Sequence, residues 1–150
     1  MPQSLSSLIF HFVFSTQNRK ALISREIESE LHKYIAGVLR SKQSRLLTAG
    51  GMPDHLHLLV SLDRQISVSE ALRDIKSNSS RWIRGRFSNQ SRFGWKTGYA
   101  AFSVSFSQIQ LVRHYIENQK AHHQKRTFKE ELVRLLKMHR VDFDERYLWD

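Results

Sequence analysis

Two histidines separated by one leucine open an apolar run in the segment GGMPDHLHLLVSL, which spans residues 50–62. If this run is a strand, its side chains alternate between two faces, and His55, His57 and Leu59 share one of them. Two imidazoles two residues apart on one face converge well enough to bind a single cation. The competing interpretation is a pair of exposed histidines on a half-buried strand, and a bare His-x-His pattern is compatible with both.

Other enzymes with a His-x-His pattern fit this chain poorly. Position 59 is a leucine, whereas a histidine-triad nucleotide hydrolase needs a third histidine at alternate spacing. No Asp-His pair follows closely, as a metallo-β-lactamase site requires. A TIM-barrel amidohydrolase is also excluded, because that barrel takes about 250 residues and this chain has 150.

A tyrosine and a glutamine lie four residues apart in SQIQLVRHYIENQKAHHQK, residues 107–125, which has helical periodicity. Tyr115 and Gln119 therefore share one helical face. The adjoining apolar stripe packs the helix and leaves Tyr115 at the edge of the contact; it consists of Ile109, Val112 and Ile116. The structural alternative is an amphipathic helix whose tyrosine merely lies at the core boundary.

Charge is the strongest global signal. Lys and Arg total 24 against 14 acidic residues, for a net charge of +10. Such a surplus favours polyanionic partners, of which nucleic acid is the commonest; the alternative is a basic protein with no specific polyanion. The side chains that we expect to contact phosphates are Arg19, Lys20, Arg73, Lys76, Arg81 and Arg84. We expect Trp82 or Trp95 to stack on a base. Four more histidines could also touch the site or DNA, but we favour a structural or solvent-facing role for each: His11, His114, His122 and His123.

Two further features of the sequence limit the possible functions. The chain has no cysteine, which excludes disulfides, thiolate zinc sites and a cysteine nucleophile. The apolar segment near the N-terminus, residues 7–15, follows no basic residue and contains His11. It is not typical of a signal peptide and is too short to span a bilayer. We therefore expect a cytoplasmic protein with no membrane partner.

The hydrophobic pattern predicts a βαββαβ order followed by helices. The strands are expected at residues 7–15, 45–49, 55–62 and 99–105. The helices are expected at 24–39, 67–84, 107–125 and 129–138, with Ser24 capping the first. Residues 50–54 read as a turn and 87–97 as a loop. This order predicts an α+β fold, a ferredoxin-like antiparallel sheet with helices on one face plus C-terminal helices. We expect one domain over residues 1–150, with a C-terminal helix and tail from about 128.

Together these motifs resemble the single-tyrosine HUH transposases, the small enzymes of IS-two-hundred-type insertion sequences, and their REP-associated relatives. HUH stands for His-hydrophobic-His, which here is His55-Leu56-His57. HUH alone is a weak signal, but HUH with a helical Tyr-x-x-x-Gln is specific. The resemblance covers nearly the whole chain from Ser7. The other stretches that carry it are HFVFSTQNRK, LRDIKSNSSRWI, GYAAFSVSFSQ, YIENQKAHH and DERYLWD.

The resemblance implies a role for each matching residue. His55, His57 and Gln119 would bind a divalent metal, Mg²⁺ or Mn²⁺, and Tyr115 would be the nucleophile. In the family the tyrosine attacks single-stranded DNA with hairpin ends and leaves a 5′-phosphotyrosine and a free 3′-hydroxyl. The resemblance also implies a homodimer with shared active sites, in which one chain's tyrosine helix meets the other chain's histidine strand.

We therefore expect a metal-dependent tyrosine transposase that cleaves and rejoins single-stranded DNA. The nearest alternative is a domesticated relative that processes chromosomal repeats. A non-catalytic nucleic-acid-binding module of the same fold is disfavoured by the intact motifs. A phosphoesterase that uses water as its nucleophile would leave no covalent DNA adduct.

Overall fold

The computed structural model describes residues 3–123 and 125–149. These residues form two compact units: unit 1 runs to Gln119, and unit 2 begins at Lys120. That residues 1–150 form one domain, with a C-terminal helix and tail from about 128, stays a prediction. Within the described residues, no helix is both long enough and apolar enough to cross a membrane.

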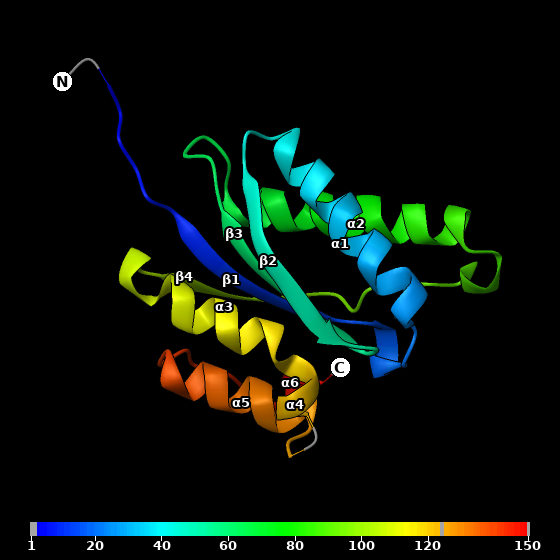
Figure 1. Ribbon diagram of the computed structural model, residues 1–150. Coiled ribbons are helices and arrows are strands. Elements are labelled where there is room, and N and C mark those ends of the chain that lie inside the picture. The colour runs from blue at the N-terminus through cyan, green and yellow to red at the C-terminus, as the bar shows by residue number, and fades with distance from the viewer. Residues whose placement is uncertain (1–2, 124, 150) are drawn as a thin grey trace. The chain divides into compact units, whose positions relative to one another are not determined.

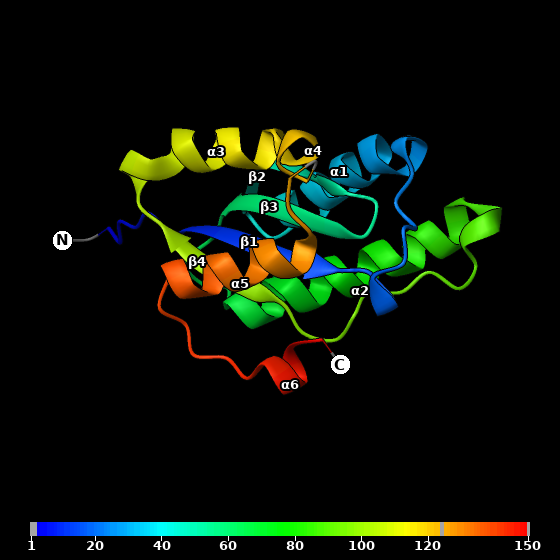
Figure 2. The same ribbon diagram turned by 90° about the horizontal axis from the view of Figure 1, so that it is seen from below.

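Unit 1 is built on a four-stranded antiparallel sheet with strand order β2-β3-β1-β4 (Figure 1). One face is covered by two helices that pack side by side, and a third helix lies on the other face, as the rotated view in Figure 2 also shows. The strands are β1 (Ile9–Ser15), β2 (Arg45–Met52), β3 (His55–Ser61) and β4 (Ala100–Val104). The helices are, in the same order, α1 (Arg25–Arg40), α2 (Val68–Arg86) and α3 (Ile109–Glu117). This is the predicted ferredoxin-like βαββαβ plan.

The face under α1 and α2 carries the larger core. The phenylalanines of β1 alternate along the strand, and all of them lie on this face. Burial of these apolar side chains is the main force that holds the helices on the sheet. The strands contribute Phe10, Phe12, Phe14, Leu56, Leu58 and Val60, and the helices contribute Leu31, Ile35, Leu39, Leu72, Ile75 and Ile83.

Both helices on this face begin at serines that the sequence indicated. The hydroxyl of Ser24 accepts a hydrogen bond from the N–H of Ile27 at 3.4 Å, and that of Ser67 accepts one from Glu70 at 3.1 Å. Each bond satisfies an N–H group of the first turn that has no partner within the helix. The loop before β4 contains one short 3-10 turn, Ser88–Gln90.

The opposite face of the sheet brings α3 unusually close to the strands. Ile9, Leu59 and Ile116 form a small buried cluster between them. Gly50 of β2 lies beneath the helix, and a Cβ atom at this position would overlap the carbonyl oxygen of Ile116. Glycine is therefore required here because the backbone of α3 occupies the space of a side chain.

The predicted turn over residues 50–54 is wrong in its first three residues. β2 continues through Met52, and the turn consists of Pro53 and Asp54 alone. Gly50 and Gly51 are needed for close packing instead, since a Cβ at Gly51 would overlap the carbonyl oxygen of His55. A glycine inside a strand commonly marks such a close approach.

The helix predicted over residues 107–125 is interrupted. A 3-10 turn (Phe106–Gln108) leads into α3, and the short helix α4 (Gln119–His122) follows a break at Asn118. The Asn118 side chain donates to the carbonyl of His114 at 2.8 Å, and asparagine often competes with helical backbone in this way. Tyr115 and Gln119 thus belong to two helices. Gln124, in the same predicted helix, lies outside the described residues.

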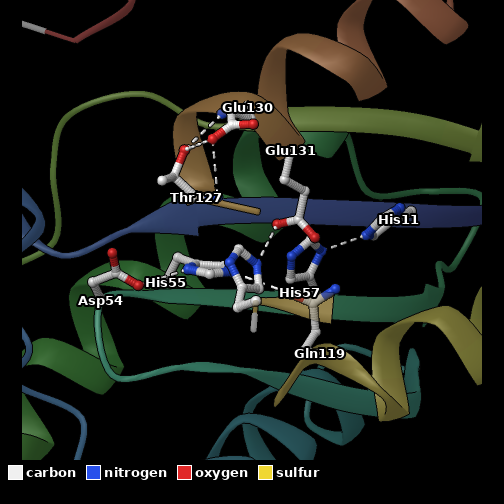
Figure 3. Close-up of polar contacts among 9 residues, drawn as sticks. His11, Asp54, His55, His57, Gln119, Thr127, Glu130 and Glu131 are labelled. Atoms are coloured by element: carbon white, nitrogen blue, oxygen red, sulfur yellow. Dashed lines mark hydrogen bonds and ion pairs between the residues drawn. The ribbon is translucent and has the colours of Figure 1, made fainter. Parts of the chain in front are cut away.

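Unit 2 contains α5 (Phe128–Met138) and α6 (Glu145–Leu148), after the end of α4. Thr127 and Glu130 form a capping box at the start of α5 (Figure 3), which satisfies two backbone donors reciprocally. Trp149 lies against Lys129, whose Nζ is 5.2 Å from the ring centroid. The aromatic end of the tail thus packs against α5. His123 also pairs with Glu131 at 3.0 Å, and both side chains are nearly fully buried.

Replacing Gly50 with alanine is expected to lower the free energy of unfolding by about 1–3 kcal/mol, the range for overpacking. The methyl group fits only if α3 moves away from β2, so amide exchange in α3 should also become faster. Chemical denaturation and hydrogen exchange measure these two effects. Gly37→Ala is the matched control: a Cβ there meets nothing within 4 Å, and alanine should stabilise α1 by about 0.5–1 kcal/mol. A Gly50→Ala protein as stable as the wild type would contradict the packing argument.

Candidate active site

β3 places His55 and His57 on the face of the sheet that α3 covers. Both rings project on the same side as Leu59, which packs against Ile116 of α3. Both histidines are fully buried, at 0% exposure, so the alternative of two exposed histidines is excluded. Their ring centroids lie 5.2 Å apart with the rings nearly perpendicular. The two imidazoles therefore form one compact cluster.

His55 is held by a polar partner on each side of its ring (Figure 3). Its Nδ1 donates to Oδ1 of Asp54 at 2.7 Å, since an ionised carboxylate can only accept. Its Nε2 faces Oε1 of the buried Gln119 at 3.2 Å. The break at Asn118 thus does not prevent Gln119 from reaching the histidines.

His11 is a member of this cluster that sequence reasoning missed. Its Nε2 lies 2.8 Å from Nδ1 of His57, the two rings stack at 5.0 Å, and His11 is 3% exposed. β1 pairs with β3 so that His11 faces Leu59 and Val13 faces His57. His11 and His57 are therefore diagonal neighbours on one face. The alternation of residues 9–15 indicates on which face of its strand His11 lies. To place His11 next to His57 one must also know that these two strands pair.

Tyr115 extends from α3 over the same cluster. Its ring centroid lies 5.9 Å from that of His57 and 6.2 Å from that of His11, and it meets both rings edge-on. These contacts are within one chain. Tyr34, by contrast, stacks on Trp82 under the opposite face of the sheet. The structure thus brings together Tyr115, His55, His57 and Gln119.

Polar contacts to β2 fix how α3 lies on the sheet. Arg113 donates from Nη1 to the carbonyl oxygen of Leu47 at 2.8 Å. The hydroxyl of Thr48 donates to the Glu117 carboxylate at 2.8 Å, and Arg113 pairs with the same carboxylate at 3.7 Å. With the close approach at Gly50, these contacts set the position of Tyr115 above the histidines.

The basic side chains predicted to contact phosphates are not gathered around the histidines. Arg19 and Lys20 lie at the 3-10 turn (Gln17–Arg19) that follows β1. The others are on α2, across the sheet from the histidines: Arg73, Lys76, Arg81 and Arg84. The two tryptophans considered for base stacking also pack under that face, where Trp82 meets Tyr34, and Trp95 meets Phe14 at 4.7 Å.

Lys76 and Arg84 serve the structure of unit 1. Nζ of Lys76 donates to the carbonyl oxygens of Lys96 and Gly98 at 2.7 and 2.6 Å. Arg84 donates from Nη1 to the carbonyl of Phe93 at 3.0 Å. Burial lowers the pKa of the Lys76 ammonium, and the neighbouring charge of Lys96 lowers it further. Both side chains thus hold the loop before β4 on α2.

The residues around His55 fit a divalent cation. Asp54 fixes the Nδ1 proton of His55, so its Nε2 presents a lone pair to the oxygen of Gln119, and their separation is 3.2 Å. Two ligands at right angles, each about 2.1 Å from an ion, lie about 3 Å apart. A carboxylate behind a ligating histidine is also a recurrent feature of metal sites. His57 would supply a second imidazole.

Comparison with known proteins places this architecture in a recognised class. The family model described as "Transposase IS200 like" matches residues 4–119. The chain therefore belongs to the IS200-like transposase family. The matched segment ends where unit 1 ends, so the family assignment rests on the unit that contains the histidines and Tyr115.

Individual relatives agree with this assignment. The chain is 23% identical over 117 residues to the ISDra2 transposase TnpA of Deinococcus radiodurans, covering 75% of this chain and 84% of that protein. It is 24% identical over 119 residues to the transposase for insertion sequence element IS200 of Salmonella typhimurium, covering 74% and 78%.

Two solved structures share the fold. The crystal structure of a putative transposase from Deinococcus radiodurans superposes with a TM-score of 0.65 at 22% identity, covering 77% of this chain and 93% of that one. A REP-associated tyrosine transposase bound to a REP hairpin gives a TM-score of 0.62 at 16% identity, covering 89% and 84%. At these identities the likeness concerns the fold alone.

Replacing Lys76 with methionine is expected to lower the free energy of unfolding by about 1–3 kcal/mol, because two carbonyls lose a charged donor. Thermal or chemical denaturation measures the change. Arg73→Met is the matched control on the same helix: its side chain is 69% exposed, and its removal should change stability by less than about 0.5 kcal/mol. A Lys76→Met protein of unchanged stability that binds DNA more weakly would instead make Lys76 a phosphate contact.

Proposed function

We propose that this transposase cleaves and rejoins single-stranded DNA through a covalent bond to Tyr115. The observation that supports this most is the contact between Tyr115 and His57, with 5.9 Å between ring centroids, beside the pair formed by His55 and Gln119. A nucleophile next to a set of metal-binding donors suits metal-assisted cleavage of a phosphodiester by a side chain. Membership of the transposase family supports the same class of reaction.

In the proposed reaction the Tyr115 oxygen attacks phosphorus, and the bond from phosphorus to the 3′ oxygen breaks. The phenol releases its proton and the departing 3′ oxygen takes one, so the products are a 5′-phosphotyrosine and a free 3′-hydroxyl. Attack by another 3′-hydroxyl reverses the step and needs no ATP, because the phosphotyrosine conserves the bond energy. A free phenol has a pKa of about 10 and therefore needs activation at neutral pH.

We propose Mg²⁺ or Mn²⁺ as the cofactor. When bound, the cation would polarise the phosphoryl oxygens and offset the negative charge that develops on them. His55, His57 and Gln119 would hold it. Two imidazoles suit Mn²⁺ better than Mg²⁺, which prefers oxygen ligands, so phosphate oxygens and water would complete a harder set of ligands.

We propose single-stranded DNA with hairpin ends as the substrate. The REP-associated transposase that shares this fold was solved bound to a REP hairpin, and the net charge of +10 suits a polyanion. Processing of chromosomal repeats, the alternative role, would use the same chemistry on such a substrate. A non-catalytic binding module would need the charge but not a buried cluster of histidines next to a tyrosine.

Tyr115→Phe is expected to abolish the covalent adduct, lowering its yield about a thousandfold or more, while DNA affinity stays within about twofold. Labelled hairpin DNA, Mn²⁺ and denaturing electrophoresis measure the adduct. Tyr99→Phe is the matched control, because Tyr99 is 46% exposed and should support a wild-type yield. Undiminished adduct in Tyr115→Phe would place the nucleophile elsewhere, and wild-type cleavage without any adduct would indicate attack by water.

The homodimer also stays a proposal, and the position of α3 bears on how a dimer would share its sites. The family resemblance implies that the tyrosine of one chain serves the histidines of the other. Within this chain, however, Tyr115 contacts His57 directly, and Arg113 and Glu117 hold α3 on the chain's own β2. These contacts support the arrangement in which each chain supplies a complete site.

A mixture of Tyr115→Phe and His57→Ala chains distinguishes the two arrangements. If each chain builds its own site, every site carries one defect, and the mixture is expected to form no adduct. If the sites are shared, one site of a heterodimer receives both defects and the other receives none, so activity returns on subunit exchange. Differently tagged chains show whether heterodimers are present. Recovered activity would refute the intrachain arrangement and leave the proposed chemistry intact.

A further inference from the structure

His11 and His57 share a single hydrogen bond whose direction decides what His57 can do. Nε2 of His11 lies 2.8 Å from Nδ1 of His57, and both rings are buried. Between two neutral imidazoles, one ring must donate and the other must accept. Two tautomeric arrangements therefore satisfy the same distance.

Only one of these arrangements leaves His57 able to bind a cation. If Nδ1 of His57 carries the proton and donates to His11, then Nε2 of His57 is unprotonated and its lone pair can bind a cation. If Nε2 of His11 donates instead, the proton of His57 is on its own Nε2, and that atom cannot be a ligand. The hydrogen bond made by one ring nitrogen sets the state of the other.

His55, on the same strand as His57, has a comparable arrangement of hydrogen-bond partners. Asp54 accepts from Nδ1 of His55 at 2.7 Å, which leaves Nε2 of His55 as the lone-pair atom that faces Gln119. His11 occupies the corresponding position behind Nδ1 of His57 (Figure 3). The two ligand candidates on β3 are thus each held through Nδ1, one by a carboxylate and the other by an imidazole.

We propose that His11 is a positioning residue that accepts the Nδ1 proton of His57 and so keeps Nε2 of His57 available for a metal. This rests on the proposed metal-dependent function. It assigns a task to a buried histidine on β1, and it makes the tautomer of His57 depend on how the strands of the sheet pair. Because β1 pairs with β3, His11 is a diagonal neighbour of His57. The acceptor for the Nδ1 proton of His57 thus comes from a residue distant in the sequence.

Ring ¹⁵N NMR of the metal-free protein tests the tautomer directly. We expect wild-type His57 to carry its proton on Nδ1, with His57→Ala identifying the signals. In His11→Phe, which keeps the bulk of the ring but removes the acceptor, the proton should move to Nε2. A wild-type protein with the proton on Nε2 of His57 would overturn the proposal without any His11 variant.

Calorimetry with Mn²⁺ alone measures the consequence for metal binding. His11→Phe should bind Mn²⁺ about 10–100-fold more weakly, the usual cost of losing a partner behind a ligating histidine. His11→Gln, which offers an amide oxygen near the position of Nε2, should recover most of the affinity. Phe102→Leu is the packing control, because Phe102 contacts the His11 ring at 6.0 Å but does not form the His11–His57 bond, and it should bind Mn²⁺ normally.

The outcomes separate this proposal from the proposed function. Equal Mn²⁺ affinity in wild type and folded His11→Phe, or His11→Gln no better than His11→Phe, would overturn the role of His11 while leaving the metal site intact. A wild-type protein that binds no Mn²⁺ would refute the metal-dependent function itself. In that event the NMR experiment would still report whether His11 sets the tautomer of His57.

Discussion

The close contact of α3 with the sheet is the constraint on which the candidate active site depends. Tyr115 comes from a helix and the histidines from two strands, so their contact exists only while the helix backbone lies directly on β2. Gly50 permits this, because any larger residue would occupy the space of the Ile116 carbonyl. Arg113 and Glu117 then fix the helix by bonds to β2. Steric fit sets the distance, and polar contacts set the orientation.

The two faces of the sheet have different tasks. The face under α1 and α2 is filled by aromatic and aliphatic side chains and supplies most of the buried apolar surface of unit 1. The other face has only a small apolar cluster around Leu59, and polar groups occupy the space beside it. Buried imidazoles are costly unless they are hydrogen-bonded, and here Asp54 bonds His55, and His11 and His57 bond each other. Stability from one face thus supports polar chemistry on the other.

Features with local causes were predictable from the sequence. Alternation in residues 55–61 and the serine caps follow from residues close together in the chain. The shared helical face predicted for Tyr115 and Gln119 is interrupted by the break at Asn118. The partnership of His11 and His57 is different, because it depends on β1 lying next to β3, 46 residues away. The role of Gly50 needs the position of α3, and a glycine pair followed by proline has the same local pattern as a turn. The tasks of Lys76 and Arg84 likewise depend on a loop whose path the sequence does not reveal.

The strict alternation of β3 has a consequence for how this chain can change in evolution. Inserting or deleting a single residue next to His55 would rotate the following side chains to the opposite faces. The imidazoles would enter the apolar core and Leu56 and Leu58 would replace them beside Tyr115, so one such event removes both the chemistry and the packing. Length variation among descendants of this sequence should therefore be purged from β3.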